Sequence, residues 1–523
     1  MSEATISDAL AGHAFVELLD LAQERLGGAV IWATDDFFAE KENLLRASKP
    51  VFIDGKYTDR GKWMDGWESR RKRVAGHDSC IVRLGVPGVI RGVVVDTAFF
   101  RGNYPEGCSL EGCLVSGNPT PEELLSSATQ WTEILPRAAL RGDSLNPFKI
   151  ESPYRYNYLR FHIYPDGGVA RLRVHGDAVP DRRFLGRPGV QDQEIDLAAV
   201  ENGGRVVTCN DMFFGSRHNL IFPGRSVNMG DGWETKRSRR AGPDWAVVEL
   251  AARGTVHRVE VDTNHFKGNY PESCALLVRD ARGATQSELE ALARSGEGWS
   301  EILARTKLQP HTRHFYEAEV AEHAPATHVL VRIWPDGGIS RLRLWGTVDR
   351  EGREHCGLRD LATLTPAALE RALLACGGST RWARELAAER PYSSLASLLA
   401  AADRIWASVG RDDVLEAFSA HPRIGEKKAE VDRGATAKTW STEEQAGMSS
   451  AQADTKSQLA VGNRDYEARF GYIYIVCATG KTAEEMLAIL RERLGNDPET
   501  EFARAREEQR KIQNLRLEKL IRR

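Results

Sequence analysis

The histidine at position 421 is the residue whose type and neighbours best suit proton transfer. His421 stands directly before Pro422, at the end of a predicted helix. A residue that precedes proline is disfavoured in helical geometry, so the imidazole is expected at the mouth of that helix. An imidazole titrates near neutrality and can give or take a proton there. Taken alone, the position also fits a histidine that only caps the helix C-terminus, and that structural interpretation is the more common one.

A second motif follows and places a glutamate at a fixed spacing from a serine. The motif comprises Ser441, Thr442, Glu443, Glu444 and Gln445. Ser-x-x-Glu is also the spacing of a capping box, in which the two side chains satisfy backbone donors at a helix start. On spacing alone the capping interpretation is favoured. Because this motif and the histidine motif occur together, a substrate site becomes the stronger hypothesis.

The order of motifs in the last third of the chain resembles that of 2-oxo-4-hydroxy-4-carboxy-5-ureidoimidazoline (OHCU) decarboxylase. His-Pro-Arg-Ile-Gly and Ser-x-x-Glu-Gln are followed by Asn463-x-x-Tyr466-x-x-Arg469-Phe470-Gly471-Tyr472 and by Leu515-Arg516-Leu517. The resemblance covers the chain from Leu364 to its end. It implies a helical enzyme of urate breakdown that uses no cofactor, releases carbon dioxide and yields S-allantoin.

The same resemblance implies a role for each matching residue. His421 would donate the proton, Glu444 would orient the ureidoimidazoline, and Arg516 would hold the departing carboxylate. Other substrate contacts would come from Pro422, Ser441, Thr442, Glu443 and Gln445, and from the backbone of Tyr474, Ile475, Val476, Cys477 and Ala478. The run Tyr472-Ile473-Tyr474 departs from the family's usual Phe-Pro-Phe, but its flanks keep the register. Carbon dioxide loss leaves a charge that the adjacent ring can delocalise, so orientation and a proton suffice.

The first two thirds of the chain consist of two copies of one repeat, so candidate residues there occur in pairs. The blocks that return in order are Asp-Leu-Ala, Asp-x-Phe-Phe, Asp-Gly-Trp-Glu, Asp-Thr-x-x-Phe-x-Gly-Asn-Tyr-Pro-Glu, Trp-x-Glu-Ile-Leu and Pro-Asp-Gly-Gly-x-x-Arg-Leu-Arg. The first copy starts with Asp20 and the second with Asp196. A unit of roughly 150 residues is far longer than a solenoid repeat and can bury its own core. Two folded copies are therefore expected.

These blocks and their duplication resemble allantoicase from Asp20 to Gly346. The resemblance implies hydrolysis of allantoate to S-ureidoglycolate and urea. Because that substrate carries a carboxylate and two ureido groups on one carbon, its site needs an arginine, carboxylates and amides, and an acid or base. The candidates are Arg71, Arg73, Arg237 and Arg239 for the carboxylate, Asp96, Asn103, Asp262 and Asn269 for the ureido groups, and Glu68, its counterpart Glu234 and His265 for proton transfer.

Each candidate also has a structural interpretation. The two glutamates persist in both copies and could be structural. His265 replaces Phe99 of the first copy, which suits one working site per pair, although a lone histidine is more often structural. Asn-Tyr-Pro is equally a tight turn. The arginines alternate with variable residues, which suits a strand with one arginine face.

The elements that would position these residues change type along the chain. Short β-rich runs at 92–96, 158–164, 259–262 and 328–334, separated by Gly/Pro turns, predict two tandem all-β sandwiches of jelly-roll type. From Leu364 the pattern becomes helical: Thr365-Pro366 opens a helix that closes near Gly377, Thr482-x-x-Glu485 opens another, and Asp497-Pro498 opens the last. The third domain is predicted to be an all-α bundle.

Composition limits the classes of protein to consider. The chain has 523 residues, of which 41% are hydrophobic and 28% charged, with a net charge of -3. The charge gives no reason to expect nucleic acid, and neither a signal sequence nor a long apolar run indicates secretion or a membrane. Cysteine spacing and the absence of His-x-His pairs argue against a disulfide framework or a tightly bound metal. The cytoplasm is the expected compartment.

We therefore expect a bifunctional purine-catabolic enzyme that acts on allantoate and OHCU, uses no cofactor and forms a homo-oligomer. The expected domains are the sandwich repeats 1–180 and 181–350 and the helical decarboxylase 361–523. The main alternative is a tandem β-sandwich ligand-binding module that carries a helical decarboxylase or oligomerisation domain. That alternative predicts exposed aromatic residues on the sandwich loops and no buried acid-base cluster.

Overall fold

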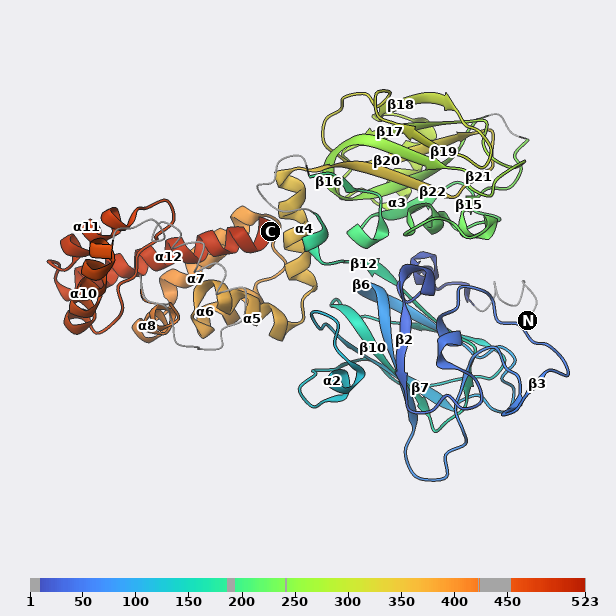
Figure 1. The fold of residues 1–523 in the computed structure, drawn as a ribbon, viewed down its shortest axis with the longest axis horizontal. Helices are drawn as coiled ribbons and strands as arrows, with labels where there is room; N and C mark the ends of the chain where they lie inside the picture. Colours follow the sequence, from blue (N-terminus) through green and yellow to red (C-terminus); the bar gives the residue numbers. More distant parts are fainter. Residues whose placement is uncertain (1–9, 186–192, 240–241, 422, 424–452, 523) are drawn as a thin grey trace. The chain divides into compact units, whose positions relative to one another are not determined.

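The computed structural model describes residues 10–185, 193–239, 242–421, 423 and 453–522. These residues divide into two compact units, Met1–Arg353 and Glu354–Arg523. The first unit contains both repeats as two β-rich domains, and the second is helical (Figure 1). The predicted division between strand and helix is confirmed.

The first repeat is built around one long strand, β6 (Asp78–Asp96), which has neighbours on both of its halves. Its first half pairs with β2 (Ala29–Ala33) and β10 (Arg155–Tyr164), and its second half pairs with β9 (Leu145–Lys149) and β12 (Arg171–Ala178). The sheet order is β1-β12-β6-β10-β7-β8, with β1 (Leu19–Asp20), β7 (Gly107–Cys113) and β8 (Thr132–Ala139). All of these pairs are antiparallel.

The second repeat follows the same plan. Its sheet order is β13-β22-β16-β20-β17-β18, and β14 and β19 also pair with the long strand β16. The strands are β13 (Ile195–Asp196), β14 (Arg205–Cys209), β16 (Asp244–Asp262), β17 (Ser273–Arg279), β18 (Ser300–Lys307), β19 (Arg313–Tyr316), β20 (Ala326–Trp334) and β22 (Arg341–Val348). Figure 1 shows β16, β20 and β22 running side by side.

Short elements complete both repeats. The small strands are β3 (Tyr57–Thr58), β4 (Gly61–Lys62), β5 (Trp67–Glu68), β11 (Gly168–Val169), β15 (Trp233–Glu234) and β21 (Gly338–Ile339). The 3-10 helices are η1 (Ala14–Glu17), η2 (Glu24–Leu26), η3 (Lys41–Leu45), η4 (Arg182–Leu185), η5 (Val200–Asn202), η6 (Arg217–Ile221) and η7 (Met229–Asp231). β5 pairs with β11 and β15 with β21, so each Asp-Gly-Trp-Glu block lies against its Pro-Asp-Gly-Gly block.

Several repeated residues hold the fold. Arg171 is buried and donates from Nη2 to Asp65 Oδ2 at 2.8 Å, and Arg341 makes the equivalent bond to Asp231 Oδ2 at 3.0 Å. Removing one partner of such a buried ion pair costs about 3–5 kcal/mol, because the other charge stays buried. These repeated residues are structural.

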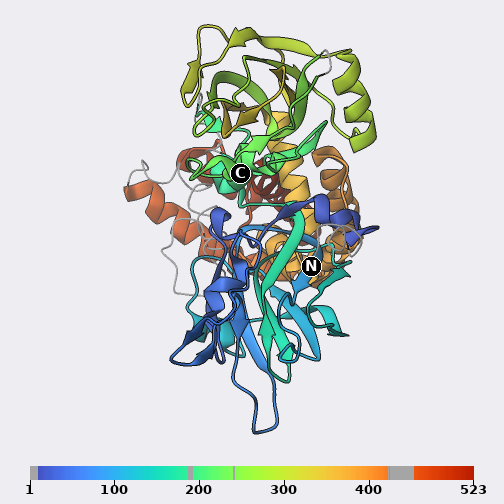
Figure 2. The same ribbon diagram turned by 90° about the vertical axis from the view of Figure 1, so that its right-hand side faces the viewer.

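One helix differs between the repeats. In the second repeat α3 (Gln286–Ser295) lies on one side of the sheet (Figure 2), where Leu289 and Ala293 pack with Leu277, Leu330 and Trp245. In the first repeat the corresponding α2 (Pro121–Leu125) is only one turn long. The matching face of the first sheet is therefore covered by a shorter helix.

The second unit is a set of packed helices. They are α4 (Arg350–Thr363), α5 (Pro366–Gly377), α6 (Thr380–Ala388), α7 (Leu395–Ser408), α8 (Arg411–Ser419), α10 (Ala453–Phe470), α11 (Ala483–Arg493) and α12 (Pro498–Arg522). The predicted helix starts are confirmed: the hydroxyl of Thr365 accepts a bond from the Ala368 amide, and Thr482 forms a capping box with Glu485. The polar stretch after Val348 is itself helical, as α4.

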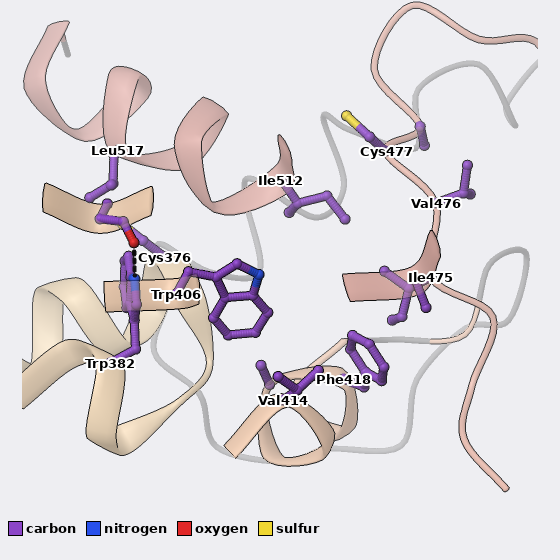
Figure 3. Packing of buried hydrophobic residues seen from close by; sticks show 14 of the residues in the cluster. Cys376, Trp382, Trp406, Val414, Phe418, Ile475, Val476, Cys477, Ile512 and Leu517 are labelled. Carbon is purple, nitrogen blue, oxygen red and sulfur yellow. Dashed lines mark hydrogen bonds between the residues drawn. The ribbon is translucent and has the colours of Figure 1, made fainter. Parts of the chain in front are cut away.

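The core of this unit lies between α12 and the shorter helices. Ile512 and Leu517 of α12 face it, together with Trp382 and Phe418 (Figure 3). The Trp382 indole Nε1 donates to Ala402 O at 3.0 Å, so this buried tryptophan leaves no polar atom unpaired. Each large side chain buried there contributes about 1.5–3 kcal/mol to folding.

Two further observations concern the cysteines and membrane contact. Every cysteine is a free thiol, and most are buried. Within the described residues no helix is both long and apolar enough to cross a membrane.

Candidate functional site

A four-residue turn, residues 165–168, organises the candidate site of the first repeat. The loop that starts at Glu68 is bonded to it along its length: Glu68 pairs with Gly168, the Ser69 amide donates to Gly167 O at 3.2 Å, and the Lys72 amide donates to Asp166 Oδ2 at 2.8 Å. Gly167 has a φ of 136°, and a Cβ there would meet Asn103 O at 2.7 Å. Only glycine fits this close approach.

The turn brings together two candidate site residues, the carboxylate of Glu68 and the side-chain amide of Asn103. Gly168 N donates to Asn103 O at 2.7 Å, and Asn103 Nδ2 donates to Glu68 Oε1 at 2.7 Å. In the second repeat Asn269 Nδ2 donates to Glu234 Oε1 in the same way. Burial raises the pKa of Glu68, and the bond from Asn103 opposes this only in part. A half-buried carboxyl with a raised pKa can act as an acid.

Asp96 and Asp262 lie at the ends of the two long strands and are buried. The turn region also holds them, since Ala170 N donates to Asp96 O at 2.8 Å and Ser340 N donates to Asp262 O at 2.7 Å. Each carboxylate accepts a backbone amide two residues ahead, from Ala98 and Asn264. Burial raises the pKa of Asp96, while the Ala98 amide and nearby arginines lower it.

The predicted strand with an arginine face is wrong. Residues 69–77 and 235–239 have no regular secondary structure, because their backbone bonds go to the turns rather than to a neighbouring strand. The predicted carboxylate ligands Arg71, Arg73, Arg237 and Arg239 are all exposed. The residues beside them are paired: Arg70 with Asp35 at 2.6 Å, and Lys72 with Asp78 at 2.5 Å. No ion pair of Arg71 or Arg73 occurs among the described residues.

His265 makes bonds that suit a structural role. Its Nε2 lies 3.0 Å from Ser226 O, and its amide donates to His311 Nδ1 at 2.8 Å. The residue has a positive φ of 70°, as does Phe99 at the matching place with 69°. The Phe99 amide donates to Asp143 in place of His311. The ring of His265 is thus bonded to the loop that contains Ser226.

In the helical unit, the structure describes only part of the predicted site. His421 is half-buried just beyond α8, with its amide donating to Phe418 O at 3.1 Å. Arg516 is buried on α12. The predicted contacts Pro422, Ser441, Thr442, Glu443, Glu444 and Gln445 lie outside the described residues. Arg423 forms a two-bond ion pair with Glu467, which ties the end of the motif to α10.

The stretch formed by Tyr474, Ile475, Val476, Cys477 and Ala478 is buried and fixed by side chains that the sequence did not reveal as functional. Arg493 Nη1 donates to Ile475 O at 2.8 Å, and Glu508 Oε2 accepts from Cys477 N at 2.8 Å. Although burial opposes it, bonds from Lys511 and from that amide lower the pKa of Glu508. Arg493 also pairs with the fully buried Glu501. Polar residues share the buried side of α12 with apolar ones, so the sequence carried no clear signal that Glu501 and Glu508 hold other parts of the domain.

Two observations bear on the ligand-binding alternative. Pairs of phenylalanines, Phe37 with Phe38 and Phe213 with Phe214, are exposed on loops of the two repeats, as that alternative predicts. Glu68, which accepts a bond from Asn103, is partly buried, whereas Asn103 is exposed. No group of three or more histidine, cysteine or acidic side chains placed to hold a metal occurs among the described residues.

Comparison with protein families matches three segments of the chain. Residues 19–179 and 195–349 match the model of the allantoicase repeat, and residues 362–518 match the model of OHCU decarboxylase. The protein named "Probable allantoicase 1" of Burkholderia mallei is 48% identical over 332 residues, which are 64% of this chain and 95% of that protein.

Two solved structures also match. The allantoicase of Saccharomyces cerevisiae is 31% identical, with a TM-score of 0.53, and the match covers 66% of this chain and 98% of that one. An OHCU decarboxylase crystallised in the presence of (S)-allantoin is 34% identical, with a TM-score of 0.26, over 29% of this chain and 97% of that one.

Proposed function

The chain belongs to the allantoicase family and carries an OHCU decarboxylase domain C-terminal to its two repeats, and we propose which of its residues carry out each reaction. It is a bifunctional enzyme of purine breakdown. The repeats hydrolyse allantoate to S-ureidoglycolate and urea, and the helical domain decarboxylates OHCU to S-allantoin. Both substrates are small molecules.

For the first reaction, the observation that carries the assignment is the Glu68–Asn103 pair on the turn 165–168. We place the working site in the first repeat. Arg71 and Arg73 hold the substrate carboxylate, which their exposure and their lack of an ion pair among the described residues support. Asn103 and Asp96 bond the ureido groups. Glu68 gives a proton to the departing urea nitrogen, which its raised pKa supports.

The second repeat keeps the same frame, and we assign it a supporting role. Glu234 and Asn269 repeat the bonded pair, and Asp262 repeats the buried carboxylate, which Arg225 approaches at 3.7 Å. Arg237 and Arg239 are exposed as their counterparts are. His265 Nε2 lies 3.0 Å from Ser226 O, which suits a structural role, and we assign this residue no part in proton transfer.

For the second reaction, we propose that His421 donates the proton and that Arg516 holds the carboxylate that leaves as carbon dioxide. The fixed backbone of 474–478 lines the pocket, and Glu444 with its neighbours completes it. Support comes from the buried position of Arg516 and from the side chains that pin Ile475 and Cys477. No cofactor takes part.

The remaining assignments concern the whole chain. We propose that both β domains are jelly-roll sandwiches, with boundaries at 1–180 and 181–350, and that the decarboxylase spans 361–523. The antiparallel pairing of the long strands on both halves supports the sandwich. We also propose a cytoplasmic homo-oligomer that binds neither nucleic acid nor membrane, in keeping with the net charge of -3.

Urea release from allantoate by the purified chain tests the first activity. A coupled urea assay should show turnover that saturates with allantoate. Binding of allantoate without urea release would instead favour the ligand-binding module, to which the exposed phenylalanines point.

A further inference from the structure

A chain of hydrogen bonds joins two histidines and a glutamate on the sheet of the first repeat. His77 Nε2 lies 2.9 Å from His162 Nδ1, and His162 Nε2 lies 2.8 Å from Glu111 Oε2. Arg160 Nε donates to the same glutamate oxygen at 2.6 Å. His162 and Glu111 come from neighbouring strands, β10 and β7, and His77 directly precedes β6.

The partners determine the direction of each bond. Although burial opposes it, bonds from Arg160 and His162 lower the pKa of Glu111, so this group is an ionised acceptor. His162 therefore donates from Nε2 and, when neutral, accepts at Nδ1 from the N–H of His77. That arrangement leaves Nδ1 of His77 as the basic end of the chain of bonds. No bond to this nitrogen occurs among the described residues.

The groups around His77 keep it neutral near pH 7. Burial lowers the pKa of His77, and His162, Lys72 and Arg137 add to this effect, while Asp78 opposes it. Tyr164 lies against the ring, with centroids 4.6 Å apart, and Arg137 stacks over Tyr164. A neutral imidazole oriented by a carboxylate is the arrangement of a general base.

The position of His77 connects this chain of bonds to the candidate site. The loop that begins at Glu68 ends at His77, and the next amide, Asp78 N, donates to Pro165 O at 3.1 Å. Both ends of the loop are thus fixed to the turn 165–168, one at Gly168 and the other at Pro165. Arg71 and Arg73 lie on the loop between them.

The second repeat lacks every member of the chain of bonds. Ala75-Gly76-His77-Asp78 becomes Ala241-Gly242-Pro243-Asp244 in the sequence. The positions of Glu111, Arg160 and His162 are taken by Leu277, Leu330 and Arg332. Leu277 and Leu330 pack under α3, and Arg332 donates to Ala293 O of that helix at 3.2 Å. The acid-base group is confined to the first repeat.

We propose that His77 is the general base of allantoate hydrolysis, positioned by His162 and Glu111. This inference rests on the allantoicase activity proposed above. His77 Nδ1 takes a proton from water as the water oxygen forms a bond to the central carbon of allantoate. The bond from that carbon to one ureido nitrogen breaks, and that nitrogen receives a proton from Glu68, so urea leaves. Transfer of the base's proton to solvent and of a solvent proton to Glu68 restores the enzyme.

The test is urea release by His77→Ala and His77→Gln in the full-length protein, with and without added imidazole. We expect kcat to fall by about 10²–10⁴-fold, the range for loss of a general base. Imidazole should restore part of the rate to His77→Ala and leave the wild type unchanged. Decarboxylation of OHCU in the same samples reports the amount of chain present, and the response of His77→Ala to imidazole reports whether the repeat is folded. If the wild-type protein releases no urea, the proposed allantoicase activity itself is wrong.

A variant of Glu111 distinguishes a role in positioning His77 from a role in packing alone. Glu111→Gln removes the charge that stabilises the protonated pair, so the acidic limb of the kcat/KM profile should move to lower pH as kcat falls. His257→Ala, an exposed histidine of the second repeat bonded to Thr347, is the matched control and should keep wild-type kcat. If the wild type releases urea and His77→Ala does so within about threefold of its rate at every pH, His77 is not the base.

Discussion

Glu68 is the candidate whose chemistry differs most from its counterpart. Both glutamates accept a bond from an asparagine amide, and burial raises the pKa of Glu68. Its loop also carries Arg71 and Arg73, which form no ion pair within the described part of the chain, and ends at His77, whereas the matching loop ends at Pro243. Residues that are identical in the sequence thus have different neighbours, and on this basis we propose that the first copy transfers protons.

Glu68→Gln should lower kcat for urea release by about 10²–10⁴-fold, while Glu234→Gln should lower it much less. Glutamine still accepts the asparagine N–H, so the turn stays formed and only the proton is lost. Steady-state urea assays on both variants make the comparison. Equal losses would mean that both repeats carry working sites.

Asp196 of the second repeat should make stability depend on pH. Burial raises its pKa from 3.8 to about 6, against nearby Arg343 and two backbone amides. The folded state therefore holds a proton that the unfolded state releases earlier, and stability falls as pH rises from 4 to 6. The loss is on the order of 2–3 kcal/mol.

Thermal unfolding of wild type and Asp196→Asn between pH 4 and pH 7 measures this. The asparagine oxygen can still accept the amides of Ala198 and Leu344. We expect the melting temperature of the variant to fall less over this range. Parallel curves would show that Asp196 does not titrate there.

Among the elements, α12 supplies side chains to the proposed decarboxylase site and its surroundings. Its buried side supplies Glu501 and Glu508, which hold Arg493 and the Cys477 amide, and its later turns supply Arg516. The position of the 474–478 backbone therefore depends on side chains that do not belong to the recognised motifs.

Glu508→Leu should reduce kcat/KM for decarboxylation by about tenfold, because the Cys477 amide loses its acceptor and the pocket backbone shifts. Glu507→Leu is the matched control: this neighbour pairs with Arg510 near the surface. Urea release should stay unchanged in both. A loss of the same size in the control would attribute the effect to the stability of α12.

Sequence patterns predicted the elements where local chemistry determines them. Threonine caps marked the starts of α5 and α11, and β-rich runs between turns marked β10 and β20. The strand predicted for the arginine run is wrong. The arginines alternate as they would on a strand, but the backbone amides of the run bond the turn 165–168. The bonds between Glu111, His162 and His77 join positions far apart in the chain, so no spacing rule could find them.

At the scale of the whole molecule, the two reactions are not consecutive. The decarboxylase yields S-allantoin, whereas the repeats consume allantoate, so a separate ring-opening hydrolase must act between them. Direct transfer of a product from one site to the other would therefore serve no purpose. Joint expression is the simpler reason for one chain to carry both domains.

In the proposed function, one chain carries two independent active sites. The most direct measurement assays the purified protein and its His421→Ala variant for urea release from allantoate and for decarboxylation of freshly made OHCU. We predict that the wild type has both activities and that the variant loses at least about 100-fold in decarboxylation alone. Absence of urea release by the wild type, or loss of both activities in the variant, would show that the chain does not carry two independent active sites.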